Sequence, residues 1–281
     1  MASGHFSFPR FLHAPLRKTP VSRRLRTVDA TQIAIIDPSL LLLAYRSGIF
    51  PMADARDDPE IFWVEPKLRG ILPLDGFRCA HSLARTLRRG RFTVTCNAAF
   101  DAVLDACAAP RAAPDDESGG TWISERIAAS YRALHRLGLA HSIECWRDGE
   151  LVGGLYGVGF DRVFCGESMF SRANDASKVA LCWLVAALRL GGVELLDCQF
   201  ITGHLASLGA VEIPQADYLA RLQRAQRRDQ SGSTGAAGAG AGASSALALP
   251  DAFGALLAAA KSAGFSSSPG NFIAQSFTHT S

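Results

Sequence analysis

The chain has 281 residues, of which 48% are apolar and 20% are charged, the profile of a globular protein with a full-sized core. The longest apolar run, residues 179–188, falls short of the ~18–20 residues that a membrane span needs, so we expect a buried helix there and no membrane segment. Net charge is +3, but the first thirty residues carry +5, which leaves about −2 (3 − 5) for the rest. The body is therefore no strongly basic nucleic-acid binder, and any RNA contact must come from a local patch.

The seven cysteines are scattered and form no CxxC pair. Several lie inside apolar runs, where a free cysteine behaves as a small hydrophobe. This usage indicates a reducing compartment, and we expect a cytoplasmic protein without a metal site, because no zinc-ligand spacing is present.

Residues 1–30 are basic, rich in Ser and Pro, and lack the apolar core of a secretory signal. A disordered extension is the favoured interpretation, and a transit-like or RNA-contacting arm is the alternative. A second change in composition comes at residues 229–246, which read as a flexible Gly/Ala/Ser-rich linker.

In chain order, the pattern first predicts a short basic helix over 82–89 and a strand over 91–96. Asn97 is then expected to cap a helix over 100–107, and a loop rich in Pro, Asp and Gly follows at 109–120. Ser124 is expected to cap a second helix, which Gly138 ends.

The next segments predict a hairpin of strands 141–146 and 151–158 around Asp148-Gly149, a strong turn signal. A strand over 163–170, a helix over 177–190 that is apolar on nearly all sides, and a strand over 193–200 follow. A further helix starts near His204. This order favours an α/β or α+β domain with helices on a mixed sheet.

The C-terminal region predicts a short helix around 253–260 and a terminal strand that pairs through Phe272, Ile273 and Phe277.

Strand alternation supplies the first chemical clue. Asp197 and Gln199 share one face of their strand, and Glu167 shares a face with Cys165 and Met169. If the two strands are neighbours, two carboxylates and an amide lie together among apolar side chains, where polar groups are either bonded or functional. The alternative is a buried network that only stabilises the strand ends.

Other candidates carry less information. Gly153, Gly154 and Gly157 indicate either close approach of a ligand or tight packing beneath the apolar helix, and no nucleotide fingerprint accompanies them. His204 and Ser207 lack a GxSxG elbow, so we expect capping or packing there. The best candidates for phosphate contact are three arginines of the basic helix: Arg85, Arg88 and Arg89.

Several runs, taken in order, resemble the leucyl/phenylalanyl-tRNA–protein transferase family over roughly residues 37–219. The most distinctive are CGESMFS at 165–171 and DCQ at 197–199. The others are GIFPM at 48–52, Trp63 with Pro66 and Arg69, TWI at 121–123, HSIE at 141–144, LVGGLYG at 151–157, ASK at 176–178 and ASLGA at 206–210. PGNF at 269–272 also looks like the family's closing segment.

The resemblance implies a small N-terminal domain followed by a domain similar to the acyl-CoA N-acetyltransferase fold. The expected organisation is a disordered basic extension (1–30), an N-terminal domain (31–95), a catalytic domain (96–224), a flexible Gly/Ala-rich insertion (225–268) and a C-terminal strand segment that returns to the body (269–281). A monomer is expected from the family alone.

The resemblance also implies the reaction. Leucine, phenylalanine or methionine is transferred from its tRNA to the α-amine of a protein beginning with Arg or Lys, which marks that protein for N-end rule degradation. No cofactor is needed, because the ester is already activated. Gln199 would hold the amine or the carbonyl, with Asp197 orienting it or receiving a proton, and Glu167 would meet the cationic acceptor residue. The leaving ribose hydroxyl is the alternative proton acceptor.

Family matches place Leu155, Phe164 and Met169 in an apolar pocket for the amino-acid side chain. Four further residues are expected to bind substrate, the last three at the terminal adenosine: Trp63, Trp122, Tyr131 and Ser171. The chain departs from close relatives by reading Trp63-Val64 in place of two tryptophans and by Leu155 in place of a common Met, so the amino-acid preference stays open.

Two rival functions remain. A CoA-dependent N-acetyltransferase needs a pyrophosphate loop before the apolar helix, where SRANDASK stands instead. A non-catalytic module that binds tRNA or N-termini would keep the pocket and the arginines, but it gives no reason for Glu167, Asp197 and Gln199 together.

Overall fold

The structure is a computed structural model that describes residues 34–110, 120–227 and 248–277. The predicted extension at 1–30, most of the loop at 109–120 and the Gly/Ala-rich run at 229–246 lie outside these ranges. Within them, no helix is both long and apolar enough to cross a membrane.

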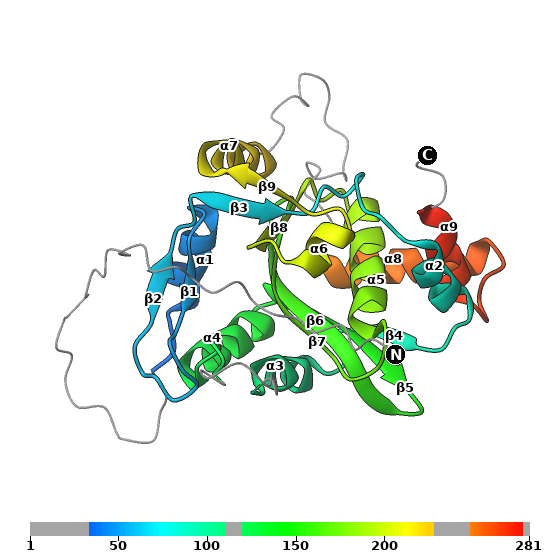
Figure 1. Ribbon diagram of the computed structural model, residues 1–281, viewed down its shortest axis with the longest axis horizontal. Helices are drawn as coiled ribbons and strands as arrows, with labels where there is room; N and C mark the ends of the chain where they lie inside the picture. Colours follow the sequence, from blue (N-terminus) through cyan, green and yellow to red (C-terminus); the bar gives the residue numbers. More distant parts are fainter. Residues whose placement is uncertain (1–33, 111–119, 228–247, 278–281) are drawn as a thin grey trace, which may run out of the picture.

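The centre of the fold is a seven-stranded sheet in the order β4-β5-β6-β7-β8-β3-β9, and a separate β1-β2 hairpin lies beside it (Figure 1). The strands are β1 Phe50–Met52, β2 Phe62–Val64, β3 Leu68–Ile71, β4 Thr93–Cys96, β5 Ala140–Arg147, β6 Glu150–Phe160, β7 Val163–Ser171, β8 Leu195–Gln199 and β9 Val211–Pro214. The helices are α1 Pro38–Arg46, α2 His81–Arg88, α3 Phe100–Ala108, α4 Glu125–Arg136, α5 Ala176–Leu190, α6 Gly203–Ser207, α7 Gln215–Gln226, α8 Leu249–Ser262 and α9 Pro269–Ser276.

The fold is the expected mixed α/β type, with a small N-terminal part of α1, β1 and β2. Helix α1 starts where Pro38 follows Asp37, whose carboxylate accepts the first free backbone N–H groups. The expected domain boundary at residue 95 needs correction, because β3 and β4 both belong to the large sheet. Arg69 and Gly70 of β3 pair with β9, and Gly70 also pairs with β8, so these residues are central to the larger domain.

The predicted hairpin, apolar helix and following strand are confirmed. Asp148 and Gly149 both have a positive φ, as a tight hairpin turn requires, and they join β5 to β6. Neighbouring strands of the large sheet are antiparallel except β7 and β8, which run parallel. A parallel pair needs a crossover, and α5 supplies it.

Helices cover both faces of the sheet and enclose two apolar clusters (Figure 1). Buried side chains of α5 fill the first cluster with those of α2, α8 and α9. The second cluster, on the other face, combines α1, α3, α4 and α7. Because α5 lies between the sheet and α8, it is buried on nearly all sides, which explains its uniform apolarity.

The glycines of β6 are explained by packing. A Cβ on Gly153 would lie 2.5 Å from Cβ of Ala176 at the start of α5. A Cβ on Gly157 would lie 2.3 Å from the carbonyl oxygen of Cys165 and 2.5 Å from the Phe164 ring. Both distances are far below van der Waals contact, so the protein itself fills the space that a ligand would need.

The C-terminal predictions are partly wrong. Residues 269–276 form the helix α9 rather than a strand, and α9 packs on α2 and α5 with Ile273 and Ala274 fully buried. The proposed flexible insertion is also wrong for residues 249–262, which form α8, whereas the short helix predicted around 253–260 is confirmed. Phe253 of α8 packs against Trp183 of α5. The spacing of apolar residues in such short segments does not show which surface they will contact, and here both helices pack on the apolar surface of α5.

Helix capping was predicted correctly for α4 and incorrectly for α3. The Ser124 hydroxyl accepts the N–H of Ile127, as expected. Asn97 does not cap α3, because its side-chain oxygen accepts the Ser142 N–H on β5 instead. The buried carboxylate of Glu144 faces that helix start and accepts the N–H of Ala98.

Candidate active site

Glu167 lies at an irregularity of β7. The pairing of β6 with β7 passes from Tyr156–Ser168 to Gly157–Gly166, so Glu167 is the extra residue of a bulge. The bulge reverses the alternation of side chains. Met169 therefore packs in the α5 cluster, while Cys165 lies in the opposite one, so the prediction that both share a face with Glu167 is wrong for Met169.

Two buried tyrosines hold the Glu167 carboxylate. The Tyr45 hydroxyl of α1 donates to Oε1 at 2.8 Å, and the Tyr131 hydroxyl of α4 donates to Oε2 at 2.8 Å. The two hydroxyl oxygens also contact each other. Burial raises the pKa of Glu167 to about 7, although the bonds from Tyr45, Tyr131 and Gln199 lower it. The carboxyl group is consequently poised between its two protonation states near neutral pH.

Gln199 ends β8 and connects the two carboxylates. Its side-chain Nε2 donates to Oε1 of Glu167 at 3.0 Å, and its backbone N–H donates to Oδ1 of Asp197 at 2.8 Å. The condition that these two strands are neighbours is met, because β7 and β8 pair with Cys165 opposite Asp197. Their pairing stops there, so Glu167, within β7, and Gln199, the last residue of β8, lie just past the point where the two parallel strands part.

Asp197 is fully buried and bonded at both oxygens. Arg69 of β3 donates from Nε to Oδ1 at 2.9 Å and from Nη2 to Oδ2 at 2.6 Å. The Tyr218 hydroxyl of α7 adds a bond to Oδ2 at 2.9 Å. With the Gln199 N–H this makes four donors on one carboxylate, which is the number of its lone pairs. Asp197 is thus an anchored acceptor whose four acceptor positions are all occupied.

Three residues of this arrangement were not predicted from the sequence in these roles: Tyr45, Arg69 and Tyr218. Arg69 was noted only as part of a motif, and the helices carrying the tyrosines were not predicted. The sequence signal for these roles was only that each residue stands next to a strand-like or apolar segment. Tyr45 is 122 residues from its partner Glu167, and Arg69 and Tyr218 are 128 and 21 residues from their partner Asp197.

Leu155, Phe164 and Met169, the residues predicted for the amino-acid pocket, lie together on the α5 side of the sheet. Leu155 of β6 pairs with Met169 of β7. Leu155 and Phe164 are buried and Met169 is half-buried. Tyr45 and Tyr131, which bond Glu167, belong to the cluster on the opposite side.

The four other substrate-binding candidates differ in solvent exposure and in whether their polar groups already have hydrogen-bond partners. Trp63 on β2 and Trp122 are half-buried, and the Trp122 carbonyl accepts the N–H of Ala53 just after β1. Tyr131 has no exposed surface, and its hydroxyl donates a hydrogen bond to Glu167. The exposed Ser171 hydroxyl donates to Ala173 and accepts from the Ser177 N–H.

The three predicted tRNA-binding arginines, Arg85, Arg88 and Arg89, are exposed at the end of α2. Helix α9 supports this end closely, since a Cβ on Gly270 would lie 2.3 Å from the Leu87 carbonyl oxygen. The end of α2 is thus a basic surface on a rigid base.

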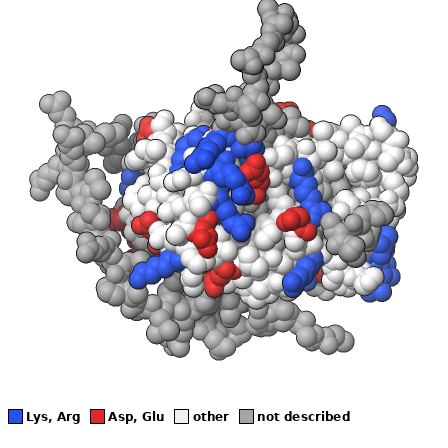
Figure 2. All heavy atoms as spheres, turned by 90° about the horizontal axis from the view of Figure 1, so that it is seen from above, with Lys and Arg blue, Asp and Glu red and all other residues white. Residues whose placement is uncertain are grey.

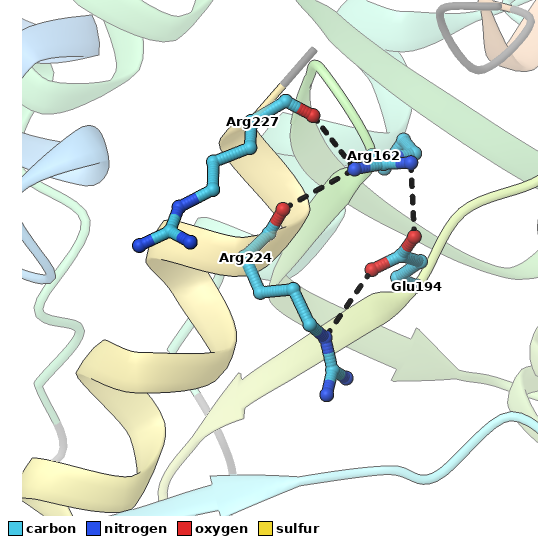
Figure 3. Close-up of a pocket in the computed structure, with 4 residues that line it drawn as sticks. All are labelled: Arg162, Glu194, Arg224 and Arg227. Carbon is cyan, nitrogen blue, oxygen red and sulfur yellow. Dashed lines mark hydrogen bonds and ion pairs between the residues drawn. The ribbon is translucent and has the colours of Figure 1, made fainter. Parts of the chain in front are cut away.

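A hollow of about 480 Å³ lies elsewhere, among Arg162, Glu194, Arg224 and Arg227 (Figure 3). Arg162 donates to the carbonyls of Arg224 and Arg227 at the end of α7 and pairs with Glu194 at 3.1 Å. These bonds cap the helix. Because Arg162 and Glu194 precede β7 and β8, the hollow lies at the opposite end of the strand pair from Gln199. The face that Figure 2 shows mixes basic and acidic side chains.

No cluster of His, Cys, Asp and Glu suited to a metal ion occurs within the described ranges. The chain is thus an α/β protein that gathers a carboxyl group, an amide and two phenolic hydroxyls where two parallel strands stop pairing. Such an arrangement of donors and acceptors suits the transfer of an activated acyl group.

Comparison with known proteins agrees with this chemistry. A sequence model of the leucyl/phenylalanyl-tRNA protein transferase matches residues 71–223, and one of its N-terminal domain matches residues 35–67. A leucyl/phenylalanyl-tRNA–protein transferase of Novosphingobium aromaticivorans is 65% identical over 262 residues, which cover 88% of this chain and 97% of the relative. Proteins of the same name from Zymomonas mobilis and Rhizorhabdus wittichii are 58% identical (68% of this chain, 70% of the relative) and 60% identical (66% and 74%). The chain belongs to the leucyl/phenylalanyl-tRNA–protein transferase family, and it is an aminoacyltransferase.

Proposed function

We propose that the protein transfers leucine, and also phenylalanine and methionine, from aminoacyl-tRNA to the α-amine of proteins that begin with Arg or Lys. We also propose that the protein is a cytoplasmic monomer and that the proteins it modifies are degraded by the N-end rule. The observation that carries it is the bond from Gln199 at the end of β8 to Glu167 in the bulge of β7, in a chain of this family.

The reaction joins the α-amine nitrogen to the ester carbonyl carbon and breaks the bond from that carbon to the ribose oxygen. One amine proton leaves, and the ribose hydroxyl gains one. Because an α-amine has a pKa of about 7.7–8.0, a useful fraction is already neutral at pH 7. Placement therefore matters more than a strong base.

Gln199 is the group we assign to placement. One of its Nε2 hydrogens bonds Glu167, while the second hydrogen and the amide oxygen remain suited to the ester carbonyl and the amine, respectively. Asp197 is assigned to orienting Gln199, because its own four acceptor positions are filled. The ribose oxygen is then the favoured proton acceptor.

Glu167 is assigned to the cationic acceptor residue. It is half-buried, and an approaching guanidinium or ammonium group would form a charge-assisted bond with it. The same positive charge would favour the ionised form of a carboxyl group whose pKa lies near 7. This gives a physical reason for preferring Arg or Lys over a neutral first residue.

The aminoacyl-tRNA would be held at three places. Leu155, Phe164 and Met169 form the apolar surface for the amino-acid side chain. Trp122, which packs like Trp63 against the second apolar cluster, offers an aromatic face for the terminal base. Tyr131 and Ser171 are better explained as supports, and the α2 arginines contact phosphates.

The rival acetyltransferase function is disfavoured at the start of α5. Asp175 is the cap residue there, and its carboxylate lies near Lys178 and Thr86. A carboxylate at this position repels the pyrophosphate of coenzyme A, which needs free backbone N–H groups. Binding of acetyl-CoA in a calorimeter would revive this rival.

The test is transfer of labelled leucine from Leu-tRNA to peptides that differ only in their first residue. We expect transfer to peptides beginning with Arg or Lys and none to a Ser peptide or to an Arg peptide whose α-amine is acetylated. Equal transfer to the Ser peptide would contradict the acceptor rule. Binding of Leu-tRNA without transfer to any peptide would favour the non-catalytic module.

A further inference from the structure

Arg69 connects three parts of the fold at one buried point. Its side chain is 1% exposed, and its guanidinium lies over the rings of Phe50 at 4.7 Å and Tyr218 at 4.4 Å. It donates to the Gly48 carbonyl before β1, and to both oxygens of Asp197 on β8. The N-terminal hairpin, the large sheet and α7 therefore converge on this residue.

The backbone of Gln199 needs such support. Its φ is +61°, in the left-handed region that a residue with a long side chain rarely adopts. The Phe200 N–H donates to the Cys198 carbonyl at 2.6 Å, which closes a three-residue turn with Gln199 at its centre. A turn of this kind with positive φ is the rarer and more strained form. Strained residues persist where their surroundings over-determine them.

Two contacts hold the turn. The Gln199 N–H donates to Oδ1 of Asp197, and β3 packs closely against the backbone of residues 199 and 200. Gly70, opposite Gln199, leaves so little room that a Cβ there would lie 2.8 Å from the Phe200 backbone. The direction of the Gln199 side chain thus depends on where the Asp197 carboxylate is held.

We propose that Arg69 and Tyr218 are positioning residues, which act through Asp197 to keep the Gln199 turn and so aim its side-chain amide. The inference rests on the role proposed above for Gln199. Neither residue touches substrate. Arg69 supplies two parallel bonds and Tyr218 supplies one, and together they leave the carboxylate no alternative orientation.

The test measures single-turnover transfer of leucine to an Arg peptide by the full-length protein. In Arg69→Lys the charge remains but the paired N–H donors are lost, and we expect the transfer rate to fall about 10- to 100-fold. In Tyr218→Phe the ring over Arg69 remains and only the hydroxyl is lost, so we expect a fall of about 3- to 10-fold. The KM for Leu-tRNA should change less than about twofold in both. If the Lys variant does not fold, the Phe variant carries the test.

The matched control is Arg46→Lys. Arg46 also pairs with an aspartate, Asp161 at 2.6 Å, and lies over a ring, that of Phe160. It has no contact with Asp197, so its variant should transfer leucine at the parent rate. An equal fall in this control would assign the effect to general loss of ion pairing and overturn the proposal.

A double-mutant cycle separates positioning from stability. In a Gln199→Ala background, Arg69→Lys and Tyr218→Phe should lower the rate by less than about twofold further, because their target is gone. The same factor in both backgrounds would overturn the inference. If the Ala background has no measurable transfer, hydrogen exchange of the Gln199 backbone N–H is measured instead, in the parent and in Arg69→Lys. We expect about tenfold faster exchange in Arg69→Lys, and an unchanged exchange rate would overturn the proposal. Full activity of Gln199→Ala alone would instead overturn the role proposed for Gln199.

Discussion

The side-chain amide of Gln199 reaches across from the end of β8 to the carboxyl group of Glu167 in the bulge of β7, at 3.0 Å. The bond joins two strands at the point where they have stopped pairing with each other. It combines a strained backbone turn on one strand with an inserted residue on the other.

Stability should depend on pH through Glu167. Its folded pKa of about 7 is above the ordinary 4.5, so the protonated form is favoured by folding. This contribution is full below about pH 4.5 and is lost as pH rises through 7. Glu167→Gln should therefore gain free energy of unfolding relative to the parent between pH 5 and 8, by up to about 3 kcal/mol. Urea titrations at several pH values measure this, with Glu150→Gln on the exposed hairpin turn as the control. A pH-independent difference would contradict the prediction.

Gly157→Ala should destabilise the protein by about 3 kcal/mol or more, because the new Cβ meets the Cys165 carbonyl and the Phe164 ring. The matched control is Gly254→Ala in α8, where no atom lies within 4 Å of the new Cβ. There we expect stabilisation of about 0.5–1 kcal/mol from helix propensity. Thermal unfolding of both variants checks the contrast. A tolerated Gly157→Ala would reopen the idea that β6 leaves space for a ligand.

The C-terminal helices should be part of the core. Phe253→Ala removes a buried ring that packs on Trp183 and should cost about 3–5 kcal/mol. Leu257→Ala, on the same helix but 39% exposed, should cost less than about 1 kcal/mol. Equal small effects in chemical denaturation would mean that α8 does not contribute to the cooperative unit.

The arginines of α2 should bind tRNA through its phosphates. Replacing Arg85, Arg88 and Arg89 together by Ala should weaken binding of Leu-tRNA and reduce the slope of log affinity against log salt by about 2 to 3. Arg136→Ala, exposed at the end of α4, should leave that slope unchanged. Filter binding at several salt concentrations measures both. Loss of affinity with an unchanged slope would argue for a folding defect in α2.

Local pattern and strand alternation determined much of the fold from the sequence alone. The turn at Asp148-Gly149, the cap at Ser124 and the apolarity of α5 are properties of short segments, and the structure agrees with all three. The chemistry of residues 165–171 and 197–199 also identified the family that the comparisons bear out. These features depend on neighbours within a few residues, which a sequence displays directly.

Contacts between distant segments were decided only by the tertiary structure. The bulge at Glu167 placed Met169 on the other face, because an inserted residue reverses a period of two. Residues 269–276 became a helix because α2 and α5 offered it an apolar surface. Arg69, Tyr45 and Tyr218 acquired their roles from partners far along the chain, and a buried carboxylate is tolerated only where such partners converge. The sequence indicated the groups that we propose for the chemistry, and the packing of β3, α1, α4 and α7 decided how those groups are held.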